Sequence, residues 1–83
     1  MREAKYGKLI KINLNDTDKI KPFINEVRKF MSDIDIMTER AVVDAKSILG
    51  VYALDLSQEA YVGILSDDVN EIRKFESAME EFR

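Results

Sequence analysis

The most informative stretch of the sequence, residues 44–51, reads Asp-Ala-Lys-Ser-Ile-Leu-Gly-Val. Ser47 precedes an apolar segment, as expected of a helix N-cap residue, whose side-chain oxygen accepts a hydrogen bond from a backbone N–H of the first turn. The segment therefore predicts a short helix, although Gly50 weakens it. Because so short a helix cannot bury every apolar side chain, we expect Val51 and Leu54 in the core. We expect three others to stay partly exposed: Ile48, Leu49 and Tyr52.

On the N-terminal side of this stretch, two alternating segments predict a β-hairpin. Apolar residues recur at every second position over 33–37 and again over 41–45, which is typical of strands with one buried face. The connection over 38–40 lacks the glycine that a tight turn favours. Further upstream, a similar alternation predicts a strand over 8–14.

Two longer amphipathic helices are also predicted. Apolar residues recur at helical spacing over 18–31, where Pro22 is tolerated only in the first turn. After a strand over 60–65, the polar residues 66–68 cap a last helix with an apolar stripe of Val69, Ile72, Phe75, Met79 and Phe82. We expect the methionines on apolar faces to fill gaps in the core: Met31, Met37 and Met79.

The resulting element order, β-α-β-β-α-β-α, favours an α+β fold. Each strand has one apolar face and each long helix one apolar stripe. The simplest arrangement is an open-faced sandwich, a four-stranded antiparallel sheet with three helices on one face. A chain of 83 residues has room for one domain, which we place at 1–83.

Composition and charge remove several function classes. The sequence contains neither cysteine nor histidine, which excludes disulfides, thiolate or imidazole metal sites and cysteine or histidine catalysis, so we expect no metal and no cofactor. Residues 32–83 hold twelve acidic and five basic side chains, which argues against nucleic acid as the main partner. Residues 1–6 lack the apolar core of a signal peptide and no apolar run could span a membrane, so we expect a cytoplasmic protein.

Residues 44–51 resemble the regulatory serine motif of HPr, the small phosphocarrier of the bacterial sugar phosphotransferase system, and its relatives. The similarity covers nearly the whole chain in element order and is close in residues from about Phe30 to Leu56. It implies phosphorylation of Ser47 by a serine-specific kinase, with Lys46 as a nearby cation. It also implies a docking surface for partner proteins at Lys46 and an apolar patch of Ile48, Leu49 and Tyr52. The simpler alternative is that Ser47 serves only as a helix cap.

The other half of the family's signature is missing. The phosphoryl-accepting loop of the family joins the first strand to the first helix and carries a histidine, then an arginine two residues later, then a proline. The histidine position falls at Asn15 or Asp16, and the arginine position at Thr17 or Asp18. Neither candidate is the neutral imidazole nucleophile that this chemistry needs, and aspartates there are better explained as helix caps. The resemblance implies the fold but not phosphohistidine carrier activity.

We therefore interpret the chain as a regulatory HPr-like protein that is not an enzyme. The expected partners are proteins: a serine kinase/phosphorylase or a transcriptional regulator of sugar use. Size and charge favour a monomer over a homodimer. Two alternatives remain open, an unusual phosphocarrier that uses Asp16 and an interaction module of unrelated function that retains only the fold.

Overall fold

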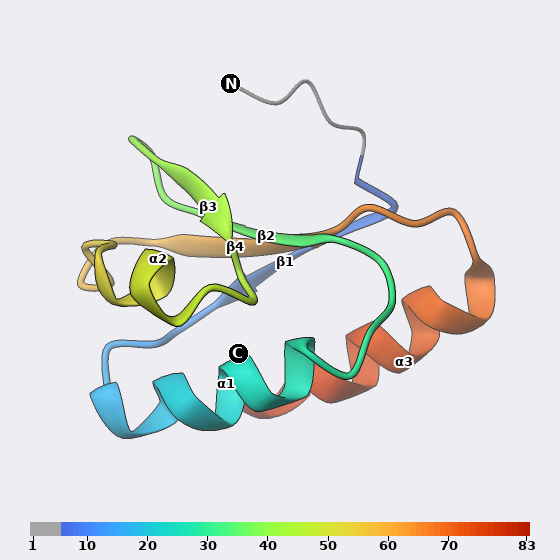
Figure 1. The fold of residues 1–83 in the computed structure, drawn as a ribbon, viewed down its shortest axis with the longest axis horizontal. Helices are drawn as coiled ribbons and strands as arrows, with labels where there is room; N and C mark the ends of the chain where they lie inside the picture. The colour runs from blue at the N-terminus through green and yellow to red at the C-terminus, as the bar shows by residue number, and fades with distance from the viewer. Residues whose placement is uncertain (1–5) are drawn as a thin grey trace.

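Figure 1 shows the fold as a computed structural model, which describes residues 6–83. The strands are β1 (Lys8–Ile12), β2 (Ile34–Met37), β3 (Val42–Asp44) and β4 (Ala60–Ile64), and the helices are α1 (Ile20–Val27), α2 (Ile48–Tyr52) and α3 (Val69–Met79). Two 3-10 turns flank them, η1 (Thr17–Lys19) before α1 and η2 (Glu80–Phe82) after α3. Within residues 6–83, no helix has the length and apolar character needed to cross a membrane. Residues 1–5, on which part of the signal-peptide expectation rests, lie outside the described residues.

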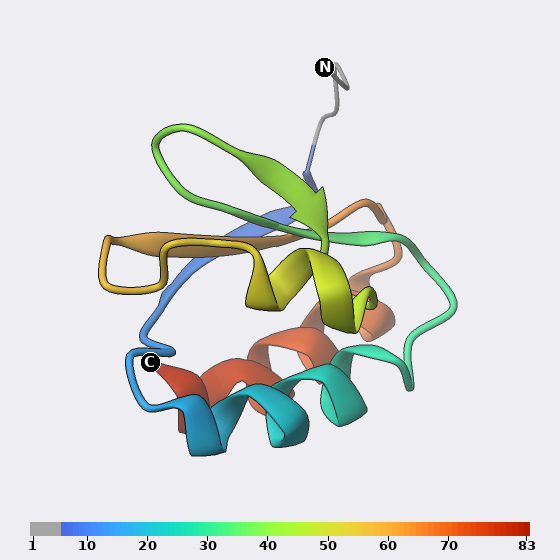
Figure 2. The same ribbon diagram turned by 60° about the vertical axis from the view of Figure 1, so that its left-hand side comes forward.

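The four strands form one antiparallel sheet in the order β1-β4-β2-β3. Val62 of β4 lies opposite Ile10 of β1 on one side and Ile36 of β2 on the other, and all three side chains are buried. Because side chains alternate along a strand, these residues mark the inner face of the sheet. All three helices cover that face, and no described helix lies on the other (Figure 2). The predicted open-faced sandwich is confirmed.

The core between sheet and helices is built from alternate strand residues and the apolar stripes of α1 and α3. Three phenylalanine rings lie fully buried within it: Phe23, Phe75 and Phe82. Phe23 and Phe82 meet edge to face, with ring centroids 5.5 Å apart. The backbone N–H of Asn13, just after β1, donates to the Phe82 carbonyl oxygen at 2.6 Å. The C-terminal turn is therefore held against both α1 and the end of β1.

Three apolar residues predicted for the core lie elsewhere. α1 ends at Val27, and the turn that follows leaves the helical phase, so Met31 is 94% exposed. Val69 is 62% exposed because it opens α3, before the turns that pack on the core. Met37 directly follows the inward-facing Ile36, so it points to the outer face of the sheet and is half-buried. Of the methionines predicted for the core, Met79 is buried there.

Candidate docking and modification site

Ser47 begins α2, as the sequence predicts. Its backbone is extended (φ −90°, ψ 111°), and its Oγ accepts a hydrogen bond from the Gly50 N–H at 3.1 Å. A Cβ at Gly50 would lie 3.3 Å from Ser47 Oγ and 3.4 Å from the Cβ of Val43. A larger residue at position 50 would therefore crowd the Ser47 hydroxyl that caps the helix, which offsets the low helix propensity of the glycine.

The backbone just before Ser47 is held by side chains from two directions. Nε and Nη2 of Arg28, at the end of α1, both donate to the Lys46 carbonyl oxygen, at 3.2 and 3.0 Å. The side chain of Lys46 in turn reaches back to the segment after α1, where its Nζ donates to the Phe30 carbonyl oxygen at 2.6 Å. The Lys46 N–H donates to Oδ1 of Asp44 at 2.9 Å. Two cationic side chains thus flank Ser47 and join the end of α1 to the start of α2.

Three apolar side chains of α2 are exposed, and we call Ile48, Leu49 and Tyr52 the α2 patch. Leu49 is 81% exposed, Tyr52 50% and Ile48 38%, whereas Val51 between them is fully buried. Leu54, also expected in the core, is partly buried and packs against it. The expected division of this short helix into a buried and an exposed side is confirmed.

The loop between β1 and α1, where the resemblance predicts the histidine position, lies beside the other end of α2. A hollow of about 270 Å³ separates them, with Asn15 and Thr17 on one side and Tyr52 on the other. Leu14, Ile20, Leu54 and Leu56 complete an apolar lining. The fold therefore brings the two sequence-predicted segments to one surface, with Tyr52 nearest the loop and Ser47 at the start of the helix.

The polar groups of this loop are used to shape the backbone. Oδ1 of Asn13 accepts from the Asn15 N–H at 3.0 Å, and Oδ1 of Asp16 accepts from the Asp18 N–H at 2.9 Å, which caps η1. Pro22 is the third residue of α1, where its missing N–H costs nothing. No group of three or more acidic side chains in residues 6–83 is arranged to hold a metal ion. Asp16 therefore acts as the cap of η1, as the simpler interpretation holds, and Asp18 lies in the first turn after it.

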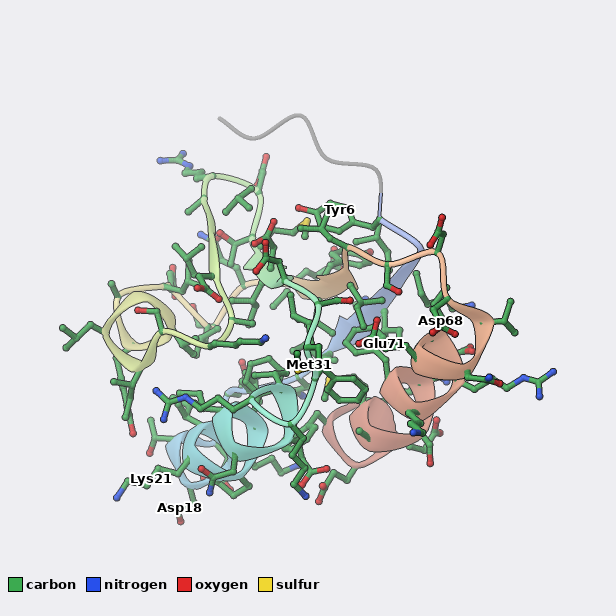
Figure 3. All side chains as sticks on the ribbon, turned by 45° about the vertical axis from the view of Figure 1, so that its right-hand side comes forward. Tyr6, Asp18, Lys21, Met31, Asp68 and Glu71 are labelled. Carbon is green, nitrogen blue, oxygen red and sulfur yellow. The ribbon has the colours of Figure 1, made fainter. Side chains whose placement is uncertain are left out.

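A second hollow, of about 630 Å³, runs between the end of α1 and the start of α3, and sequence reasoning gave no sign of it. We call it the α1–α3 groove. Met31 and Glu71 both line it, and Figure 3 shows them on the surface between the two helices. Glu71 accepts from the Ser32 hydroxyl at 2.5 Å and from the Ser32 N–H at 3.4 Å. The pKa of its carboxyl lies below the usual value, first because of the Ser32 hydroxyl, then the Ser66 hydroxyl, with a smaller effect of the Lys46 charge.

Two residues that shape the site could not be identified from the sequence. Arg28 stood out only as one of many basic residues in 1–31, and Glu71 only as an acidic residue in the first turn of a helix. Their partners, the Lys46 carbonyl and Ser32, lie 18 and 39 residues away in the chain. No local motif encodes contacts of that kind.

Comparisons with known proteins agree with this architecture. Residues 17–82 match the family model described as "PTS HPr component phosphorylation site". The search of curated proteins finds no match. The crystal structure of a phosphocarrier protein HPr from Bacillus anthracis is similar with a TM-score of 0.68 and 17% identity, over 92% of this chain and 96% of that one. The crystal structure of HPr-C-His from Thermoanaerobacter tengcongensis is similar with a TM-score of 0.71 and 23% identity, over 90% of each chain. Since the family model spans most of the sequence and the fold agrees, the chain belongs to the HPr family of the phosphotransferase system.

Proposed function

We propose that this member of the HPr family is a regulatory protein, phosphorylated on Ser47 and bound by partner proteins at the α2 patch. The observation that carries the proposal is the direct continuity of Ser47 with exposed apolar side chains on the same short helix. Exposed apolar clusters with a large aromatic anchor are typical of protein docking surfaces. The partners we infer are a serine kinase/phosphorylase and a transcriptional regulator of sugar use.

Phosphorylation would change this surface through charge. The kinase transfers the γ-phosphoryl group of ATP to Ser47 Oγ; a P–O bond of ATP breaks, ADP leaves, and a base on the kinase takes the hydroxyl proton. Phosphoserine carries about −1.5 to −2 charges near neutral pH. That charge would stand one residue from the first apolar side chain of the patch, Ile48, and beside the cations Arg28 and Lys46. A partner that reads the patch would therefore distinguish the two forms.

Phosphohistidine transfer has no place in this proposal, because the 83 residues include no histidine. At the corresponding loop, Asp16 is occupied as the cap of η1. A chain of this kind should take no label from phosphoenolpyruvate in the presence of the first enzyme of the phosphotransferase system. Label that appears and is lost on treatment with hydroxylamine would instead support an aspartyl phosphate and the carrier alternative.

The modification is tested by intact mass after incubation with ATP and an HPr-type serine kinase. We expect one added phosphate on the natural chain and none on Ser47→Ala. Ser77→Ala is the matched control, because it removes an exposed serine of α3 and should be phosphorylated normally. A natural chain that stays unmodified, or a Ser47→Ala chain that still gains phosphate, would refute the regulatory role of Ser47. The module that retains only the fold would then become the better interpretation.

Docking is tested separately with the same kinase. Leu49→Ser removes the most exposed side chain of the patch, and kcat/KM for phosphorylation should fall by roughly tenfold, as for a typical interface anchor. Leu9→Ser is the matched control, because Leu9 is 50% exposed but alternates with the buried Ile10 and so points to the outer face of the sheet. Equal losses for the two variants would show that the α2 patch has no special role in docking.

A further inference from the structure

The contact between Lys46 and Phe30 links the residue before Ser47 to the end of α1. The last carbonyl groups of a helix and its exit turn have no partner within the helix, and a lysine ammonium is well suited to satisfy one of them. Nζ of Lys46 does so at the Phe30 carbonyl, at 2.6 Å in a partly buried position. This charge-assisted hydrogen bond fixes the backbone at the exit of α1.

The same exit segment forms one wall of the α1–α3 groove. The ring of Phe30 packs edge to face on Phe75 of α3, with centroids 6.0 Å apart. The next two residues are the exposed Met31 and Ser32, which is held by Glu71. Lys46 thus holds the segment from one side by its bond to Phe30, and Glu71 from the other by its bonds to Ser32. The lowered pKa of Glu71, to which the Lys46 charge contributes, is consistent with the two groups lying in one network.

We propose that Lys46 couples the phosphorylation state of Ser47 to the α1–α3 groove, by leaving the Phe30 carbonyl to pair with a phosphate on Ser47. A phosphate dianion is a stronger partner for an ammonium group than a neutral carbonyl, so the modification favours the released position of Lys46. The freed segment 29–32 then opens more readily, and the groove beside Met31 changes shape. This coupling rests on the proposed function, since it needs a phosphate on Ser47.

The coupling is measured on the full chain with phosphoserine encoded at position 47 during synthesis, so that the result does not depend on any kinase. The probe is amide hydrogen exchange at Ser32, followed by NMR. We expect exchange to become roughly ten- to a hundredfold faster on phosphorylation, the effect of losing one hydrogen bond that involves a charged group. Shifts of the Met31 methyl signal should accompany it.

Two variants make the test specific. Lys46→Gln should exchange faster at Ser32 even without phosphate and should show no further change with it. Lys74→Gln removes another cation that lines the groove and should respond to phosphate as the natural chain does. Unchanged or slower exchange at Ser32 in the phosphorylated chain would overturn the coupling, since Lys46 would then hold phosphate and carbonyl together. An equal response in Lys46→Gln would overturn it as well. Failure of the kinase to modify Ser47 would refute the proposed function alone.

Discussion

Two segments meet at one surface of this molecule, and they carry different kinds of side chain. Residues 44–52 have a capped helix start, two flanking cations and an exposed apolar patch. Residues 13–19 form a loop whose polar side chains cap and turn the backbone, with no imidazole among them. The first segment combines a helix cap with an exposed apolar surface, whereas the side-chain hydrogen bonds of the second are local and shape its own backbone. A shared fold therefore does not determine the chemistry of each surface segment, because function depends on the particular side chains placed there.

The largest difference should appear when a buried side chain of the first segment is compared with an exposed side chain of the second. Val51→Ala should lower the free energy of unfolding by about 2 kcal/mol, because Val51 is fully buried and its truncation leaves a cavity. Thr17→Ala in the loop should cost less than about 0.5 kcal/mol, since Thr17 is exposed. Urea unfolding of both variants checks this. Similar losses would show that the loop is as tightly built as α2.

The helix caps at Ser47 and Asp16 should differ less in their contribution to stability. Ser47→Ala should cost about 1 kcal/mol, because Gly50 loses the partner of its N–H. Asp16→Ala should cost about half as much, because it caps a single 3-10 turn at an exposed site. Thermal unfolding of the two variants ranks them. A larger loss of stability for Asp16→Ala would mean that the loop contributes more to the folded state than its hydrogen bonds indicate.

The pH dependence of stability at Glu71 tests whether the polar contacts near Ser47 reach this carboxyl, because the Lys46 charge contributes to its lowered pKa. Hydrogen bonds from Ser32 and Ser66 hold the pKa of this carboxyl below its usual value of 4.5 in the folded state. The stabilisation is therefore complete above that value and is lost as the pH falls through the lower, folded pKa. Glu71→Gln should destabilise the protein at pH 7, and this effect should disappear as the pH falls below 4.5 and through the lower, folded pKa of Glu71. Glu81→Gln, at an exposed site of η2, serves as the control. A penalty for Glu71→Gln that does not change with pH would contradict the ionised network.

The smallest effect on stability is expected at the patch itself. Leu49→Ser should change the free energy of unfolding by less than about 0.5 kcal/mol, because Leu49 is 81% exposed. Its effect on kinase docking should nevertheless be large. Urea titration of the variant separates the two roles. A loss of stability comparable to that of Val51→Ala would assign Leu49 to the core and remove it from the docking surface.

Local patterns were sufficient to predict most of the fold. The alternation at Ile10 and Ile12, the cap at Ser47 and the later part of the α3 stripe, Phe75 and Met79, each depend on neighbours within a few residues, and the structure agrees with them. Met31 shows the limit of this reasoning. Its spacing fits a helical stripe, but α1 ends at Val27, and nothing local indicates that the chain then turns away from the core.

The candidate site was predictable only in part. Ser47 and the α2 patch follow from a short motif and from the small size of the helix. The hydrogen bonds of Arg28 and Lys46 between the ends of α1 and α2 do not follow from any motif. A basic side chain in a highly charged sequence could equally well point into solvent. Such pairings are set by the tertiary structure and have no periodic signature.

The pairing of β1 has a consequence for the order in which the chain acquires its structure during synthesis. β1 is made before the other three strands of the sheet, yet its neighbour in the sheet is β4, with Lys8 opposite Ile64. The hydrogen bond from the Asn13 N–H can form only later, after Phe82, whose carbonyl oxygen accepts it, has been synthesised. A nascent chain that ends before residue 60 can form the hairpin of β2 and β3 but leaves an apolar strand without a partner, a state prone to association with other chains. The loop after β1 and the helix α2 can therefore meet as one surface only once translation has passed the last strand.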